Sequence, residues 1–264
     1  MNPVTVSGTP GLRYQRSGQG PPLIILHGMF GSARNWHSIA RALEQDCQVI
    51  TADLRNHGES PHRPGMDYKD MSADVITLMD TLELGTAGIM GHSMGGKVAM
   101  TLALSRPERV ARLIVVDIAP VGYRHDFRAI FAALRALPLG RLENRRQAQD
   151  TLLERLTDPV LCAFLLQNLQ RDAQGFHWRV NLPALERGME AISGFPADLL
   201  ERRYDGPTLF IAGAESRHIR PQHKPLIETL FPQAEIVTVA GAGHWPHTEQ
   251  AQAFLSVVSG FLRS

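Results

Sequence analysis

Short apolar runs alternate with helical patterns along most of this 264-residue chain, and that alternation constrains the fold more than any other feature. The first two runs alternate apolar and polar residues, which suits antiparallel strands, whereas the later runs are continuously apolar, as strands buried on both faces are. Strand–helix alternation indicates a parallel sheet covered by helices. The predicted strands are 4–8, 12–18, 22–28, 47–54, 87–92, 111–119, 207–214 and 234–243, and the helices are 32–45, 68–84, 94–110, 222–231 and 249–263. We therefore predict an α/β fold with a mostly parallel eight-stranded sheet and helices on both faces.

Residues 122–204 interrupt this rhythm, because they carry no strand signal and are typical of several short helices. We predict a small helical cap there, inserted into a core formed by residues 1–121 and 205–264. Placed at the carboxyl end of the sheet, the cap would roof a pocket.

The charge pattern and the apolar content narrow the kinds of partner. The formal net charge is +1 and the arginines are scattered, which argues against a nucleic-acid partner. No apolar stretch is long enough to span a membrane, and the first residues lack a signal-peptide layout. Cys47 and Cys162 match no metal or redox spacing and are expected to be buried thiols. These features predict a cytoplasmic protein with no nucleic-acid or membrane partner, and they leave the oligomeric state open.

The segment "GHSMGG", residues 91–96, predicts a nucleophilic serine. It is a G-x-S-x-G pattern that follows an apolar strand and opens a helix, the setting in which Ser93 would stand on a tight turn. Side chains at Gly91 and Gly95 would collide with the neighbouring strand and helix. The helix amino terminus beside Ser93 favours developing negative charge.

His244, in "AGAGHWPH" after the last strand, is the predicted base, because the glycines beside it, Gly241 and Gly243, let that loop swing over the sheet. His247 is expected to point to solvent. For the oxyanion hole, the turn in "LIILHGMFGS" predicts the Met29 amide as first donor, with Phe30 as the alternative, and Met94 as the second. His27 is expected to brace that turn.

The motifs "HGMFGS", "DLRNHGES", "GHSMGGKVAM", "VVDIAPV" and "GAGHW", in this order, resemble the α/β-hydrolase superfamily of serine esterases across nearly the whole chain. Together with "FHWRVNLPAL", they resemble the small YbfF-like esterase group. The resemblance implies an α/β-hydrolase fold and a carboxylesterase acting on short acyl or thioester substrates, with Ser93 as nucleophile and His244 as base.

Two carboxylates compete for the role of triad acid. Glu215 lies near the slot after the strand "PTLFIAG" where most α/β-hydrolases carry aspartate, but Ser216 occupies that slot and Glu215 stands one residue early. Asp117 ends an earlier strand, and the resemblance of "VVDIAPV" to the esterase group favours it. We predict Asp117 and keep Glu215 as the alternative. Asp53 is expected to hold Arg55 and nearby amides.

The predicted chemistry is ester hydrolysis through an acyl-enzyme on short-to-medium acyl groups, and it requires no metal or organic cofactor. The predicted partner is therefore a small-molecule ester. The same triad also supports carbon–carbon bond hydrolysis, perhydrolysis and acyl transfer, and a non-catalytic binding protein of this fold is the non-enzyme alternative. Five apolar side chains are candidates for the pocket wall: Phe30, Ile118, Val121, Trp178 and Trp245.

Overall fold

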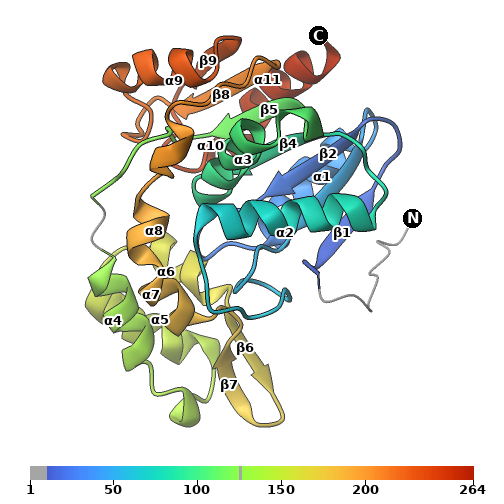
Figure 1. Ribbon diagram of the computed structural model, residues 1–264. Coiled ribbons are helices and arrows are strands. Elements are labelled where there is room, and N and C mark those ends of the chain that lie inside the picture. The colour runs from blue at the N-terminus through green and yellow to red at the C-terminus, as the bar shows by residue number, and fades with distance from the viewer. Residues whose placement is uncertain (1–10, 125–126) are drawn as a thin grey trace.

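The computed structural model describes residues 11–124 and 127–264, and its central element is a seven-stranded sheet (Figure 1). The strand order is β1-β3-β2-β4-β5-β8-β9; β1 is antiparallel to β3, and every other neighbouring pair is parallel. The strands are β1 (Tyr14–Ser17), β2 (Pro22–Leu26), β3 (Gln48–Ala52), β4 (Ala87–His92), β5 (Val110–Val116), β8 (Thr208–Gly213) and β9 (Ala234–Val239). The mostly parallel α/β architecture predicted from the sequence is confirmed. The eighth predicted strand, residues 4–8, lies outside the described residues.

Helices cover both faces of the sheet because the buried strands send apolar side chains to both sides. In β2, Ile24 and Leu26 join one core cluster, whereas Leu23 and Ile25 join the other. The first cluster includes side chains of α2, α3 and α9, and the second includes side chains of α1 and α11. These helices are α1 (His37–Leu43), α2 (Tyr68–Thr81), α3 (Met94–Ser105), α9 (Lys224–Leu230) and α11 (Ala251–Arg263). A further short helix, α10 (Pro246–Glu249), lies between β9 and α11.

The helix that follows the G-x-S-x-G pattern is shorter than its apolar pattern predicts. The sequence pattern extends to residue 110, but α3 ends at Ser105. Pro107 follows two residues later, and a residue that precedes proline is pushed out of the helical region, as Arg106 is with φ −139°. Pro107–Arg109 forms a single 3₁₀ turn before β5 begins.

Residues 122–204, which we call the insert, connect β5 to β8 and gather at one end of the molecule (Figure 1). The insert contains the predicted short helices α4 (Arg128–Ala136), α5 (Arg145–Leu156), α6 (Pro159–Leu166), α7 (Leu182–Arg187) and α8 (Met189–Ser193). It also contains a two-stranded antiparallel hairpin, β6 (Leu169–Asp172) and β7 (Gly175–Trp178), so the prediction of helices alone was wrong. Each strand has only four residues, too few for a period-two pattern to stand out, and Gly175 supplies the positive φ (113°) at the turn.

The sheet register brings the loops after several strands to one edge. His92 pairs with Val116, and Val116 pairs with Ile211, so Ser93 and Asp117 follow directly opposed residues on adjacent strands. The loop carrying His244 follows β9, the next strand beyond β8. In the described part of the chain, no helix combines the length and the apolar character needed to cross a membrane.

Candidate active site

Ser93 occupies a strained turn between β4 and α3. Its backbone has φ 52° and ψ −116°, a conformation that is rare for residues other than glycine. The flanking glycines permit the turn. A Cβ on Gly91 would lie 2.1 Å from the Gly95 carbonyl oxygen, and one on Gly95 would lie 2.6 Å from the His27 carbonyl oxygen. The local sequence therefore holds the Ser93 hydroxyl at the sheet edge, beside the amino terminus of α3.

Ser93, His244 and Asp117 are joined by hydrogen bonds although they lie far apart in the sequence. His244 Nε2 is 3.1 Å from Ser93 Oγ, and His244 Nδ1 is 2.7 Å from Asp117 Oδ2. The backbone N–H of Ser93 also donates to the carbonyl of Val116, which ties the serine turn to the strand that carries the acid. This geometry allows His244 to remove the Ser93 proton while Asp117 holds the ring.

The loop after β8 contributes a serine to this site. Glu215 is exposed, and its backbone N–H donates to the Ala242 carbonyl. Ser216, which occupies the slot where the acid would stand, donates its hydroxyl proton to Asp117 Oδ2 at 2.5 Å. The hydroxyl thus meets the carboxylate carried by the neighbouring strand, and Glu215 makes no contact with His244 among the described interactions.

Asp117 is fully buried and strongly hydrogen-bonded, so it stays ionised. Burial by itself disfavours the charged form, but hydrogen bonds from His218, His244 and Ser216 outweigh that penalty and hold the pKa of the carboxyl well below its ordinary value. The backbone N–H of Gly213 donates to Oδ1 at 3.0 Å. Asp117 also has a positive φ, 49°, so the strand end turns sharply to aim this side chain.

His244 is held from both sides of its loop. His92 Nε2–H donates to the His244 carbonyl oxygen at 2.7 Å, and the Glu249 carboxylate accepts the N–H groups of Gly243 and Trp245. Burial lowers the pKa of His244 below its ordinary value, and the hydrogen bond to Asp117 opposes that shift only in part. The ring is therefore neutral near pH 7, as a general base must be.

The turn after β2 is braced by two buried imidazoles. His27 Nε2 accepts the Leu54 N–H, and its Nδ1–H donates to the Gly28 carbonyl, in agreement with the bracing role predicted for it. His57 Nε2 accepts the Phe30 N–H at 3.2 Å. This bond uses the Phe30 amide, the alternative oxyanion donor predicted from the sequence. Met94, the first residue of α3, carries an N–H with no acceptor inside its own helix.

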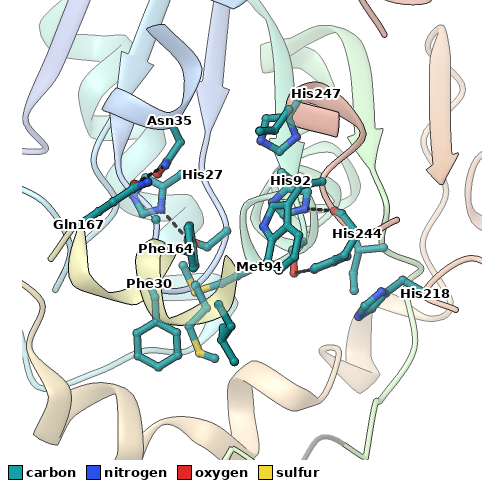
Figure 2. Close-up of a pocket in the computed structure, with 18 of the residues that line it drawn as sticks. His27, Phe30, Asn35, His92, Met94, Phe164, Gln167, His218, His244 and His247 are labelled. Carbon is teal, nitrogen blue, oxygen red and sulfur yellow. Dashed lines mark hydrogen bonds between the residues drawn. The ribbon is translucent and has the colours of Figure 1, made fainter. Parts of the chain in front are cut away.

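Ser93 and His244 line a cavity of about 690 Å³. Figure 2 shows His244 among its lining residues. Of the five predicted wall residues, Phe30, Ile118 and Trp245 line it. Among the described lining residues Val121 and Trp178 are absent, because both are half-buried against the larger core cluster and Trp178 pairs with Leu169 in the hairpin. The insert supplies part of the wall, including Leu161 and Phe164 of α6. The volume is within the range of about 300–1,000 Å³ common for small-ligand pockets.

Two further sequence expectations were wrong. His247 is buried, not solvent-facing, because its ring stacks on Trp36 with centroids 4.2 Å apart. Asp53 accepts the N–H groups of Ala33 and Glu59, as predicted, but it does not hold Arg55. Arg55 pairs with Asp70 and Asp74 of α2 instead.

Buried neutral histidines make the fold sensitive to acid. Burial lowers the pKa of His27 to about 4 and of His57 and His247 to about 3, against about 6.5 in an unfolded chain. Between those values the unfolded chain binds protons that the folded chain does not, so each ring reduces the stability by about 1.4 kcal/mol per pH unit as the pH falls. We expect the urea midpoint to fall markedly between pH 6.5 and pH 4, measured by circular dichroism. A midpoint that stays constant over this range would contradict the burial of neutral rings.

Asp117, His218 and His244 are the candidate metal-ligand group found among residues 11–124 and 127–264, with ligand atoms within 4.8 Å of one another. A metal bound there would have to displace the proton of His244 Nδ1 that faces Asp117. Asp117 Oδ2 and His244 Nδ1 are therefore already engaged in the hydrogen bond that orients the imidazole. Cys47 and Cys162 are free and buried, as predicted.

Comparisons with known proteins identify the family of this chain. A family model described as alpha/beta hydrolase fold matches residues 21–251. The chain is 42% identical to mouse sn-1-specific diacylglycerol lipase ABHD11, covering 92% of this chain and 81% of the relative. It is 37% identical to the Escherichia coli esterase YbfF, covering 91% and 92%. A solved structure of a marine microorganism esterase matches with a TM-score of 0.92 and 35% identity, covering 95% and 99% of the two chains. The chain therefore belongs to the α/β-hydrolase family and, within it, to the group of esterases that includes YbfF.

Proposed function

We propose that this protein is a serine carboxylesterase that hydrolyses short-to-medium acyl esters or thioesters through an acyl-enzyme. The observation that carries the proposal is the unbroken chain of contacts from Ser93 Oγ through His244 to Asp117, 3.1 Å and 2.7 Å long, with Ser93 and His244 lining a largely apolar cavity. The names of the relatives, an esterase and a diacylglycerol lipase, agree with ester hydrolysis.

In the proposed mechanism, Ser93 Oγ attacks the ester carbonyl carbon as His244 Nε2 takes its proton. The carbonyl oxygen becomes an oxyanion that accepts hydrogen bonds from the amides of Met29 and Met94. The tetrahedral intermediate then collapses, and His244 gives its proton to the leaving alcohol or thiol. Water repeats the sequence on the acyl-enzyme and releases the acid. Asp117 remains ionised and stabilises the imidazolium.

We further propose that the insert serves as a cap that bounds the acyl pocket. Two contacts tie it to the catalytic loops: Asn168 Nδ2 donates to the Phe30 carbonyl at 2.7 Å, and Asn35 Nδ2 donates to Gln167 Oε1 at 2.8 Å. Phe164 of α6 packs near Trp245, with ring centroids 5.7 Å apart. A wall of this kind limits the length of the acyl group that the cavity accepts.

A series of nitrophenyl esters tests the proposed substrate range. We expect kcat/KM to be largest between butyrate and octanoate and to fall for palmitate, because insert side chains such as Leu161 and Phe164 form part of the cavity wall and would limit acyl length. Hydrolysis of a diacylglycerol, the substrate in the name of the 42% relative, belongs in the same series. A maximum at palmitate would contradict the proposed acyl preference.

Two further assays on the pure protein distinguish an esterase from the alternative functions. A fluorophosphonate probe should label pure protein on the peptide that carries Ser93, and failure to label would favour a non-catalytic binding protein. Turnover of a ring-cleavage dienone, or transfer of the acyl group to an added alcohol, would reassign the reaction within the same triad.

A further inference from the structure

A second imidazole lies against the proposed triad. His218 follows Ser216 by two residues, and its ring stacks on the His244 ring, with centroids 3.8 Å apart and planes 23° from parallel (Figure 2). His218 Nδ1 is 3.4 Å from Asp117 Oδ2, the same oxygen that His244 Nδ1 contacts at 2.7 Å. One buried carboxylate oxygen therefore faces two titratable rings.

The hydrogen bonds of Ser216 assign the proton on His218. The single hydroxyl proton of Ser216 goes to Asp117, at 2.5 Å. Its oxygen then acts as the acceptor for the His218 backbone N–H at 3.2 Å and for His218 Nδ1 at 3.1 Å. His218 Nδ1 must therefore carry a hydrogen, which points at Ser216 Oγ and, at longer range, at Asp117 Oδ2.

The position of His218 is fixed through its backbone. The Tyr123 hydroxyl donates to the His218 carbonyl at 2.5 Å and accepts the Ala119 N–H at 2.9 Å. His223 Nδ1 also lies 3.2 Å from that carbonyl, and the His218 side chain is only 18% exposed. The stacked ring is thus held by the chain that continues from Asp117 and by the loop after β8.

We propose that His218 is a positioning residue for the esterase reaction: its neutral ring holds the plane of His244 and donates toward Asp117, while its protonated form competes with the His244 imidazolium for the same carboxylate. This inference rests on the proposed function. The single negative charge of Asp117 can compensate one neighbouring cation well. A positive charge on His218 therefore disfavours the His244 imidazolium that forms during acyl transfer. The effect is on the protonation of His244, not on the reacting atoms.

The other described ionisable groups around the pair, which include Tyr123 and His223 beside His218, are unchanged in every variant considered. The His92 ring lies 4.7 Å from the His244 ring on its other side, and His247 lies 4.8 Å beyond His92. Glu249 holds the loop of His244 through backbone N–H groups. Changes in pH dependence between wild type and a His218 variant therefore report on His218.

The test is the pH dependence of kcat/KM for His218→Phe on a short nitrophenyl ester. Phenylalanine keeps a flat ring but removes the donor to Asp117 and the competing charge, and both losses favour protonated His244. We expect the acid limb, where activity rises with pH as His244 becomes neutral, to move up by about half a pH unit or more. Turnover on the plateau should fall by less than about tenfold, because Asp117 keeps its other donors.

Two further variants separate the proposed roles. His218→Asn places an amide donor near the position of Nδ1 and cannot be protonated, so the acid limb should move up by less than in the phenylalanine variant. His177→Phe is the matched control, since His177 lies on β7 with a side chain that is 45% exposed, and its acid limb should stay at the wild-type midpoint.

An acid limb that stays in place or moves down in both His218 variants would overturn the inference, even if turnover falls. The low-field NMR resonance of the His244 Nδ1 proton gives the same titration without substrate, and its midpoint should shift in the same direction. If wild type and Ser93→Ala are equally inactive on esters, the proposed function fails, whereas an active wild type with an unmoved limb refutes only the role of His218.

Discussion

Replacing Ser93 by alanine is expected to lower turnover of a short nitrophenyl ester by about 10⁶-fold, the loss typical of removing a triad nucleophile. Without Oγ, no acyl-enzyme can form, and His244 has no proton to remove. The amides of Met29 and Met94 remain, so slow hydrolysis by water at the oxyanion hole sets the residual rate. The measurement is kcat under saturating ester, with the fluorophosphonate probe as a second readout on the same protein.

Ser105→Ala is the matched control for this change. Ser105 is the last residue of α3, at the opposite end of the helix from Ser93. Its hydroxyl donates to the Thr101 carbonyl. We expect turnover of this variant to equal that of wild type. Near-normal turnover by Ser93→Ala would instead move the nucleophile to another residue and remove the basis of the proposed mechanism.

Replacing Asp117 by asparagine is expected to lower turnover by about 10⁴-fold, because the amide cannot stabilise the imidazolium and favours the wrong tautomer of His244. The substitution suits the backbone, since asparagine tolerates the positive φ of 49° found at this position. A loss of activity with an unchanged circular dichroism spectrum would therefore report on the imidazole and not on folding.

Glu215→Gln separates the two candidate acids. Glu215 is exposed, and its backbone N–H donates to the Ala242 carbonyl, a bond that glutamine would keep. Turnover by the Glu215→Gln variant should therefore remain within about twofold of wild type. The opposite result, with Glu215→Gln inactive and Asp117→Asn active, would reject Asp117 as the acid while leaving the fold and the reaction class intact.

The parts of this protein that the sequence predicts well are those dictated by local backbone chemistry. The strand–helix alternation defines the parallel sheet, since buried strands need apolar side chains on both faces. The G-x-S-x-G turn needs glycines at fixed positions, so Ser93 can be identified from its immediate neighbours. His244 follows from its place after the last strand. The cytoplasmic location and the division into core and cap stay predictions.

The parts that the sequence does not predict depend on contacts between distant segments. Ser216 has a signal, because it stands where an acid would be expected, but its partner Asp117 lies 99 residues away. His218 gives no sign of its stacking on His244 until the loops after β8 and β9 are brought together. The solvent-facing position predicted for His247 is wrong, and the sequence gives no sign of this because its stacking partner, Trp36, lies far away in the chain. Ile118 lines the cavity whereas Val121 and Trp178 pack against the core, and the sequence does not separate them because all three are apolar.

The loop that carries Met29 and Phe30 is hydrogen-bonded both to the loop after β3 and to the insert. His57 accepts the Phe30 N–H, while Asn168 of the insert donates to the Phe30 carbonyl, so the two peptide groups on either side of the Phe30 Cα are both hydrogen-bonded. Asn168 follows α6 closely in the chain. A movement of α6 would therefore strain the hydrogen bond from Asn168 to the Phe30 carbonyl unless Asn168 itself stayed in place. If Met29 serves as the proposed oxyanion donor, a shift of the insert that moves Asn168 also shifts the neighbouring Phe30 peptide, so entry of the ester and alignment of that donor would be coupled.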